Sequence, residues 1–339
     1  MSFDIKQVSP SLVRVDTSVL HEGKGGFSVT HNASYNIAGD GSITVDNAVI
    51  PQGPKFSPAR IGVRMLLDKR LTNLEYLARG PMENYNDRKR GSDVGRYTST
   101  VAGEMVTYTK PMENGNHEDT SWLTLRGAGV PTFLAKSEGS WLQFSTLPYT
   151  DEQMDPAEYL VDLPKSEATV LNLSAQTLGV GQAAHQPLPK YRIYTNPTTF
   201  SYGLNLLDAG VKDVSAIGRK LASTNRAQPV LAQRDMQGFI SLDADSSYSL
   251  DGLTWTNYTK PFAFAKGGTL KVRSAAKGGQ FIESSIPFDA WVNRSAWKAT
   301  ANNFEPGEGN PEHVLDGNPG TIWHSRYSPE RLKPPHYIT

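Results

Sequence analysis

The sequence predicts an all-β protein, and three observations favour this fold class. Roughly the first 205 residues consist of short segments with β-branched and aromatic side chains. Glycine, proline and asparagine separate these segments, as expected for the turns between strands. Helical periodicity is almost absent from the chain. Together these features predict a large antiparallel sandwich or barrel.

The clearest predicted element is a β-hairpin. Residues 26–37 and 42–50 are two strand-like segments, and the turn between them contains Asp40-Gly41. An Asp-Gly pair between β-prone segments is typical of a tight hairpin turn. Further strands are predicted at residues 60–67, 132–136, 141–146, 169–177 and 199–206.

One segment has helical rather than strand periodicity. In residues 213–223, Val214, Ile217 and Leu221 recur at helical spacing, and Asp213 is placed to cap the N-terminus. We therefore predict a short helix that links two domains as a spacer.

The chain divides into four predicted parts. Residues 1–208 form a large β-domain, and residues 209–228 form the helical linker. Residues 229–291 have the length and strand pattern of a small immunoglobulin-like sandwich. Residues 292–339 are too few for an independent β-domain. We expect this last segment to be incomplete, and to be loosely packed or paired with a neighbouring molecule.

Composition excludes several classes of function. The 34 basic side chains equal the 34 acidic ones, and no long basic block occurs, so we expect no nucleic acid and no membrane surface as a partner. The chain has no cysteine, which excludes disulfides and thiolate sites. We find neither a signal peptide nor an apolar stretch of about 18 residues that would span a membrane.

Two loops could carry acid–base chemistry. The string Pro-Met-Glu-Asn occurs twice and supplies Glu83 and Glu113. Hydrolysis of a glycosidic bond requires two such carboxylates on either side of the bond. The alternative is that both are loop anchors, which accept backbone N–H groups and pair with Arg88 or Arg90.

Other candidate side chains have a structural interpretation beside the functional one. His117 is either a hydrogen-bonded loop histidine or a contact to a sugar. Four tryptophans in strand-like segments are predicted to be core residues, namely Trp122, Trp141, Trp255 and Trp291.

The strongest cluster lies near the C-terminus. A tight turn presents the oxygen-bearing side chains of Asp316, Asn318 and Thr321, a donor set that suits calcium. A plain turn without metal is the alternative. An aromatic face and polar donors, the combination that binds sugars, lie beside the turn in Trp323, His324 and Arg326.

Residues from about 10 to 207 resemble the C-terminal "small chain" domain of family 2 glycoside hydrolase β-galactosidases. The matching motifs lie at residues 58–63, 80–88, 111–115 and 178–181, with Trp122 between the last two. The resemblance implies an antiparallel supersandwich, and it implies that the catalytic glutamates lie in an upstream barrel with no counterpart here. The strands that normally begin this domain are expected to be absent, and we therefore expect an apolar sheet edge to be exposed.

The sequence departs from that family at two places. Met82 and Met112 stand where the family usually has glutamine. Some relatives place a tryptophan after the Gly-x-Gly motif, where it stacks on the sugar, whereas His185 is nearest here. The candidates for substrate contact are His185, which stands nearest to that tryptophan, together with Glu113, Asn114 and His117.

The remaining parts resemble two other modules. Residues 229–288 resemble the small fibronectin-type-III-associated sandwich. Residues 293–339 resemble the start of a discoidin (coagulation factor 5/8 type C) domain of the carbohydrate-binding module family 32 type. In that family the Asp-Gly turn binds a structural calcium, and a histidine near the tryptophan binds galactose.

The expected function is an accessory C-terminal portion of a retaining β-galactosidase, which supports the active site and binds carbohydrate. Its expected partners are galactosides or other glycans, a catalytic barrel on another segment or chain, and further copies in a homo-oligomer. We expect the parent protein in the bacterial periplasm or at the cell surface, with no cofactor for catalysis. The alternatives are a stand-alone carbohydrate-binding or structural module, and a sugar epimerase, which would require a His/Glu pair in a concave face.

Overall fold

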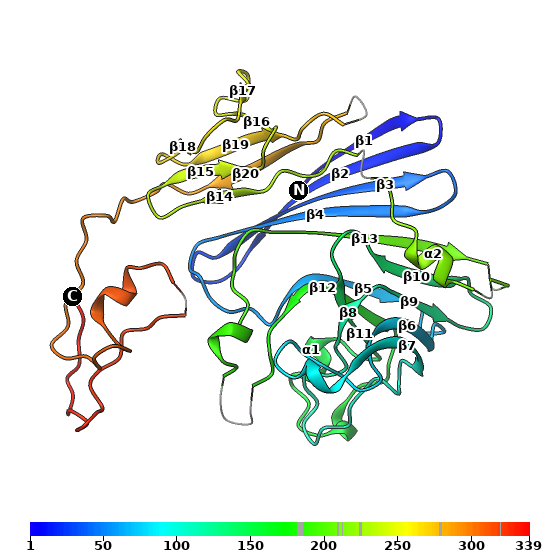
Figure 1. Cartoon of the computed structure of the whole chain (residues 1–339), viewed down its shortest axis with the longest axis horizontal. Coiled ribbons are helices and arrows are strands. Elements are labelled where there is room, and N and C mark those ends of the chain that lie inside the picture. The colour runs from blue at the N-terminus through cyan, green and yellow to red at the C-terminus, as the bar shows by residue number, and fades with distance from the viewer. Residues whose placement is uncertain (182–185, 209, 212, 224–225, 278–279, 319) are drawn as a thin grey trace.

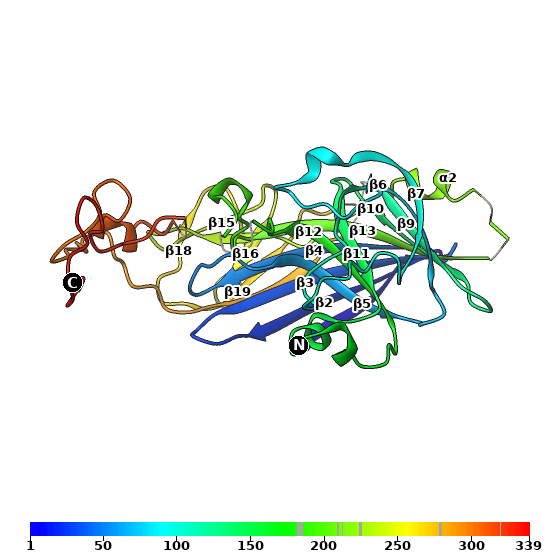
Figure 2. The same ribbon diagram turned by 90° about the horizontal axis from the view of Figure 1, so that it is seen from below.

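The computed structural model describes residues 1–181, 186–208, 210–211, 213–223, 226–277, 280–318 and 320–339. Antiparallel strands make up most of the regular structure, and the molecule is elongated, with the C-terminal segment at one end (Figures 1 and 2). The prediction of an all-β fold is confirmed. The helices of the described residues are short: α1 (Asp151–Met154), α2 (Ser215–Arg219) and the 3-10 turns Lys89–Gly91, Leu160–Asp162, Pro189–Tyr191 and Pro311–Val314.

Two sheets form the large N-terminal unit. The larger sheet has nine strands in the order β1-β2-β3-β4-β13-β10-β9-β6-β7. Its strands are β1 (Ser2–Ser9), β2 (Leu12–Glu22), β3 (Ser28–Ala38), β4 (Ile43–Gln52), β13 (Thr198–Leu207), β10 (Thr132–Ser137), β9 (Trp122–Arg126), β6 (Asn73–Gly80) and β7 (Asp93–Thr100). The second sheet has the order β5 (Arg60–Leu67), β12 (Thr169–Thr177), β11 (Leu142–Leu147) and β8 (His117–Thr120).

The predicted strands are confirmed. The hairpin is β3 paired with β4, with Ser34 opposite Asp46. No strand is predicted for residues 2–22, but these residues form β1 and β2 and extend the sheet beyond this hairpin. The sheet edge at β1 exposes Phe3 (65 %) and Ile5 (60 %), as expected for an apolar edge.

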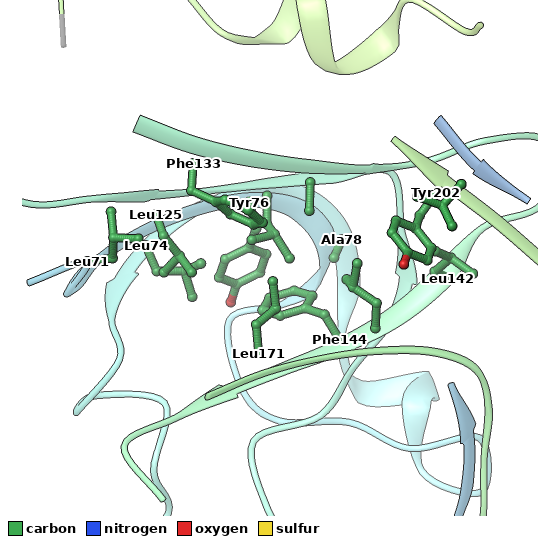
Figure 3. Close-up of a cluster of buried hydrophobic side chains, with 14 of the residues drawn as sticks. Leu71, Leu74, Tyr76, Ala78, Leu125, Phe133, Leu142, Phe144, Leu171 and Tyr202 are labelled. Carbon is green, nitrogen blue, oxygen red and sulfur yellow. The ribbon is translucent and has the colours of Figure 1, made fainter. Parts of the chain in front are cut away.

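The main core lies between the two sheets (Figure 3). Tyr76 from β6 and Phe144 from β11 meet edge to face, with their ring centroids 5.2 Å apart. Leu125 from the large sheet and Leu171 from the small one are fully buried beside them. The alternation of side chains along each strand explains this arrangement, because every second residue points between the sheets.

The prediction for the tryptophans is right for Trp122, which is fully buried, and wrong for Trp141, which is 60 % exposed. Trp141 lies outside β11, because that strand begins at Leu142, and the turn from β10 holds its indole in solvent. Trp255 and Trp291 are half-buried.

The predicted helix is shorter than expected and has a packing role. It spans Ser215–Arg219, and Leu221 lies beyond it, 60 % exposed. Val214 and Ile217 cover Trp122 on the outer face of the large sheet. A Cβ at Gly218 would lie 2.6 Å from Cγ of Trp122, so only glycine allows this approach. The segment therefore covers Trp122 and is not only a spacer.

A second, smaller unit packs beside the large one. One sheet contains β14 (Ala232–Arg234), β15 (Phe239–Leu242) and β18 (Phe262–Ala263), and the other contains β17 (Thr256–Asn257), β16 (Ser247–Ser249), β19 (Gly268–Arg273) and β20 (Glu283–Phe288). The core of this unit includes Leu270, Val272 and Ile286, and it also takes in Ile50 from β4. The two units therefore share apolar packing.

Polar contacts strengthen the junction between the units, where β20 lies over the strands β2–β4 (Figure 1). Arg14 donates to the carbonyl oxygen of Phe281 at 2.8 Å. Arg226 binds the buried carboxylate of Asp46 through Nε and one terminal nitrogen, at 2.7 and 2.8 Å.

The C-terminal segment is loosely built, as expected from its length. In its described residues the strand pairing is limited to one bridge, between Ala301 and Ile338. Large apolar side chains stay open to solvent, including Trp297 (55 %) and Ile322 (55 %). Across the described chain, no helix has both the length and the apolar character needed to cross a membrane.

Candidate functional site

The two Pro-Met-Glu-Asn loops lie side by side at one end of the large sandwich. The first follows β6 and the second precedes β8, so these neighbouring strands deliver both loops to the same place. Asn84 donates its backbone N–H to the carbonyl oxygen of Asn116 at 2.7 Å, and the Asn116 amide donates to the carbonyl oxygen of Asn84 at 2.8 Å. The repeat in the sequence thus becomes one structural unit.

Glu83 has the geometry of a loop anchor. Its carboxylate accepts the backbone N–H of Gly115 at 2.7 Å. It also pairs with Arg88 at 3.0 Å and accepts the Tyr108 hydroxyl at 2.5 Å. A cation and two donors therefore hold the carboxylate, which is what the loop-anchor alternative predicted for Glu83 with Arg88.

The surroundings of Glu113 combine burial with a cationic partner and a hydroxyl donor. It contacts the guanidinium of Arg60 and accepts the hydroxyl of the buried Tyr85 at 3.2 Å. Burial raises the pKa of the Glu113 carboxyl, although Arg60 acts in the opposite direction. Burial also raises the pKa of Tyr85, so the tyrosine stays a hydrogen-bond donor. A role for Glu113 with Glu83 as a catalytic pair stays a prediction.

The raised pKa of Glu113 predicts a pH dependence of stability. A carboxyl that is harder to ionise in the folded chain than in the unfolded chain favours folding below pH 4.5, and this contribution is lost as the pH rises through the folded pKa. Glu113→Gln does not titrate, so we expect its stability relative to the parent to increase between pH 4 and pH 7. Urea unfolding at both pH values measures this difference.

Glu152 provides the control with the opposite sign. Its hydrogen bonds to Arg64 lower its pKa to about 2, so its contribution to stability is lost as the pH falls. The relative stability of Glu152→Gln should therefore decrease from pH 4 to pH 7. An equal trend in both variants would contradict the assignment for Glu113.

Asn114 and His117 are buried behind this surface. The Asn114 side chain accepts the Val106 N–H at 3.0 Å and donates to the Met112 carbonyl at 2.7 Å. His117 is 0 % exposed, with Nδ1 2.8 Å from the Arg79 carbonyl oxygen and Nε2 2.5 Å from Glu104. This geometry is that of the hydrogen-bonded loop histidine. It is also a His/Glu pair, but it lies in the core rather than in an open concave face.

A third loop joins the first two. Asp87 accepts the backbone N–H of Gly181 at 2.8 Å and that of Val180 at 3.3 Å. Asn86 donates to the carbonyl oxygens of Thr177 and Tyr191, both at 3.1 Å. We call residues 80–88, 110–116 and 178–181 together the loop face. His185 lies outside the described residues.

Several residues of this surface have no functional signal in the sequence. Arg60 begins a predicted strand and lies in the motif at residues 58–63, and Tyr85 and Asp87 lie in the motif at residues 80–88, but none of the three has a role that the sequence alone indicates. Met82 (72 %) and Met112 (48 %) are exposed on the loop face.

The predicted sugar-binding residues near the C-terminus are adjacent but differ in exposure. Trp323 is half-buried, and its indole N–H donates to the Asn303 carbonyl oxygen at 3.3 Å. His324 and Arg326 are exposed. Tyr327, which is not among the predicted residues, packs edge to face with His324, with a centroid distance of 5.1 Å, and is 45 % exposed.

The predicted calcium turn is closed by its own hydrogen bonds. Thr321 donates its hydroxyl to Asp316 at 2.7 Å and to the Asn318 carbonyl oxygen at 2.8 Å. Carboxylate, carbonyl and hydroxyl oxygens converge here, and these are the ligand types that calcium takes, but they supply a single negative charge. Within the described residues, no group of three histidine, cysteine, aspartate or glutamate side chains is placed to hold a metal ion. Calcium stays a prediction.

Comparison with known proteins identifies the family. The chain is 26 % identical over 168 residues to a β-galactosidase of Priestia megaterium, covering 48 % of this chain and 16 % of the relative. It is 27 % identical over 198 residues to the β-galactosidase of Streptococcus thermophilus, covering 57 % of this chain and 19 % of the relative. With the enzyme of Lactobacillus delbrueckii subsp. bulgaricus it shares 35 % identity over 161 residues, 47 % of this chain and 15 % of that protein. The chain thus spans less than a fifth of the length of these relatives.

Among solved structures, a galactose mutarotase related enzyme from Lactobacillus acidophilus aligns with this chain at 10 % sequence identity and a TM-score of 0.27. The alignment covers 63 % of this chain and 74 % of the chain of that enzyme. That score is too low to add to the assignment. The family model described as "Beta galactosidase small chain" matches residues 3–206. This chain therefore belongs to the β-galactosidase small-chain family.

Proposed function

We propose that the chain is the C-terminal accessory portion of a β-galactosidase, which supports an active site formed elsewhere and binds carbohydrate. One observation carries this proposal: the family match covers residues 3–206, whereas the chain spans only 16 % of a relative named β-galactosidase. The remaining length of that relative leaves room for a catalytic segment with no counterpart here.

We further propose that the loop face is the surface that contacts the catalytic segment. Its three loops are fastened together by buried and partly buried hydrogen bonds, so the face is preorganised. Exposed methionines lie beside a charged network that includes Arg60 and Glu113. An apolar contact next to oriented charges is the composition expected of a specific protein interface.

The chain alone should not hydrolyse a chromogenic β-galactoside such as o-nitrophenyl β-galactoside. The expected rate is that of the buffer, because the proposed catalytic carboxylates lie on another segment. Release of nitrophenol that is lost in Glu113→Gln and Glu83→Gln would contradict this and would support the catalytic pair.

The partner can be tested directly. If the coding sequence just upstream contains a glycosidase barrel, that segment should be active only when it is co-expressed with this chain. Arg60→Ala should weaken the association, whereas Arg70→Met, away from the loop face, should not.

A homo-oligomer of this chain stays a prediction. Light scattering of the chain alone measures its oligomeric state.

The second candidate is a stand-alone carbohydrate-binding module. It is supported by the C-terminal segment, where the exposed His324, Arg326 and Tyr327 place an aromatic edge beside polar donors. We propose that this segment is discoidin-like and that residues 229–291 form a fibronectin-type-III-associated sandwich.

Calorimetric titration with galactose tests this binding. We expect His324→Ala to reduce the affinity about tenfold, because it removes a ring and a hydrogen-bonding nitrogen. His21→Ala, on an exposed strand end, serves as the matched control.

Calcium should raise the affinity for galactose, and Asp316→Ala should abolish the effect of calcium. Absence of heat with and without calcium would reduce the segment to a structural role.

A further inference from the structure

A cleft of about 400 Å³ lies between the two sandwich units. The large unit contributes β4, β13 and the turn from β10 to β11, whereas the small unit contributes the turn around Asp245 and the segment before Lys277. This volume falls in the range of small-molecule sites. No residue of the loop face and none of the C-terminal segment lines it.

The floor of the cleft is charged but internally neutral. Asp46 and Arg226 form a bidentate pair, and Asp46 also accepts the Ser201 hydroxyl at 2.6 Å. Because the pair satisfies itself, the floor presents a fixed polar surface without a net charge that requires a counterion.

One wall is neutralised in the same way. Glu138 accepts the backbone N–H of Ala222 at 2.8 Å, and its other oxygen lies 3.0 Å from Nζ of Lys136. Glu138 is therefore compensated within the protein and does not attract a cation into the cleft.

The rim of the cleft differs from the floor and the wall, because its charged side chains can still form hydrogen bonds with a ligand. Asp243 uses one oxygen to accept the Leu231 N–H at 2.7 Å. No hydrogen bond or ion pair among the described residues engages the side chains of Asp245 and Lys277, although both line the cleft and are exposed. Acceptors and a donor thus remain free at the same opening.

Apolar side chains complete the lining. Phe200, Pro229 and Val230 contribute carbon surface next to the polar floor. A sugar has an apolar C–H face and a rim of hydroxyl groups, each of which can donate and accept. Such a molecule matches apolar surface, free carboxylate acceptors and a free ammonium donor together.

We propose that this cleft binds a neutral carbohydrate of one or two rings. Its hydroxyl groups donate to Asp243 and Asp245 and accept from Lys277, and its C–H face contacts the apolar side chains. The free carboxylates disfavour an anion. A purely apolar ligand is also disfavoured, because it would cover the polar floor of the cleft without forming hydrogen bonds to it. The site does not rest on the proposed β-galactosidase function.

Two variants test the cleft without altering the core. Asp245 has a left-handed backbone with φ of 60°, which asparagine also tolerates, so Asp245→Asn removes only the charge and one acceptor. Ser140 is an exposed residue of the lining, so Ser140→Trp fills the opening without breaking a core contact. Urea unfolding of both variants should match that of the parent chain.

The binding experiment uses saturation-transfer NMR with galactose, glucose, lactose and N-acetylglucosamine, and with spermidine as a cationic probe. We expect at least one sugar to bind, Asp245→Asn to weaken it about fivefold to tenfold, and Ser140→Trp to abolish that signal. His324→Ala should leave it unchanged, which separates the cleft from the C-terminal segment.

Three results would overturn the proposal. These are no signal from any of the four sugars, a sugar signal that is lost in His324→Ala but kept in Ser140→Trp, and binding of spermidine alone. Because this readout requires no hydrolysis, failure of the cleft and failure of the proposed β-galactosidase function are distinguishable.

Discussion

Replacing Arg226 with methionine is expected to lower the free energy of unfolding by about 3–5 kcal/mol. Arg226 from the linker is the cation for Asp46, whose side chain is 2 % exposed. The variant leaves this carboxylate buried without a cation, and the hydroxyl of Ser201 cannot replace a guanidinium. Urea unfolding at pH 7 measures the loss.

The surface pair of Arg70 and Asp68 provides the matched control. Their closest contact is 2.6 Å, but their side chains are 55 % and 39 % exposed. Water solvates Asp68 when its partner is removed, so Arg70→Met should change the free energy of unfolding by less than about 1 kcal/mol. The double variant Asp46→Asn with Arg226→Met should be more stable than Arg226→Met alone, because no buried charge remains. Equal losses in Arg226→Met and Arg70→Met would show that burial of Asp46 does not increase the effect of removing its cation.

The second large effect is expected in the core of the large sandwich. Phe144→Ala should lower the free energy of unfolding by about 3–5 kcal/mol, since it removes a fully buried ring and leaves a cavity. The ring packs on Tyr76, beside which Figure 3 shows it, with a centroid distance of 5.2 Å. It also stacks on His117, with a centroid distance of 4.9 Å. Those neighbours lie on other strands, so the cavity has little freedom to collapse.

Trp141, three positions earlier in the same segment, is the control for this prediction. Its side chain is 60 % exposed, so Trp141→Ala should change the free energy of unfolding by no more than about 0.5 kcal/mol. A loss in Trp141→Ala as large as that in Phe144→Ala would restore the original prediction that this tryptophan belongs to the core. Thermal unfolding by circular dichroism gives the same comparison independently.

Local patterns in the sequence account for much of the strand assignment. Residues 60–67 and 169–177 were predicted with the bounds that β5 and β12 have. The edge hairpin of β1 and β2 was missed although Val13 and Val15 alternate with polar residues, because the more buried face of β2 is the polar one. On the side that faces the small unit, Arg14 and Asp16 form a buried ion pair where an apolar row would be expected.

The candidate site was predictable only as a set of loops. Two Pro-Met-Glu-Asn strings indicated equivalent loops, but not that Gly115 and Glu83 would meet. The burial of His117 depends on Glu104, which approaches from the preceding loop, and no periodicity indicates that pairing.

The sequence by itself determined the all-β class, most strands of the large sandwich and the family motifs, because strand propensity and turn chemistry act over a few neighbouring residues. Tertiary structure alone decided which groups meet. Asp46 and Arg226 are 180 positions apart, and Ile50 of one unit completes the core of the other. The raised pKa of Glu113 and the cleft between the units have the same origin. Burial and charge pairing are properties of the packed chain, and distant segments supply them only after the sheets have formed.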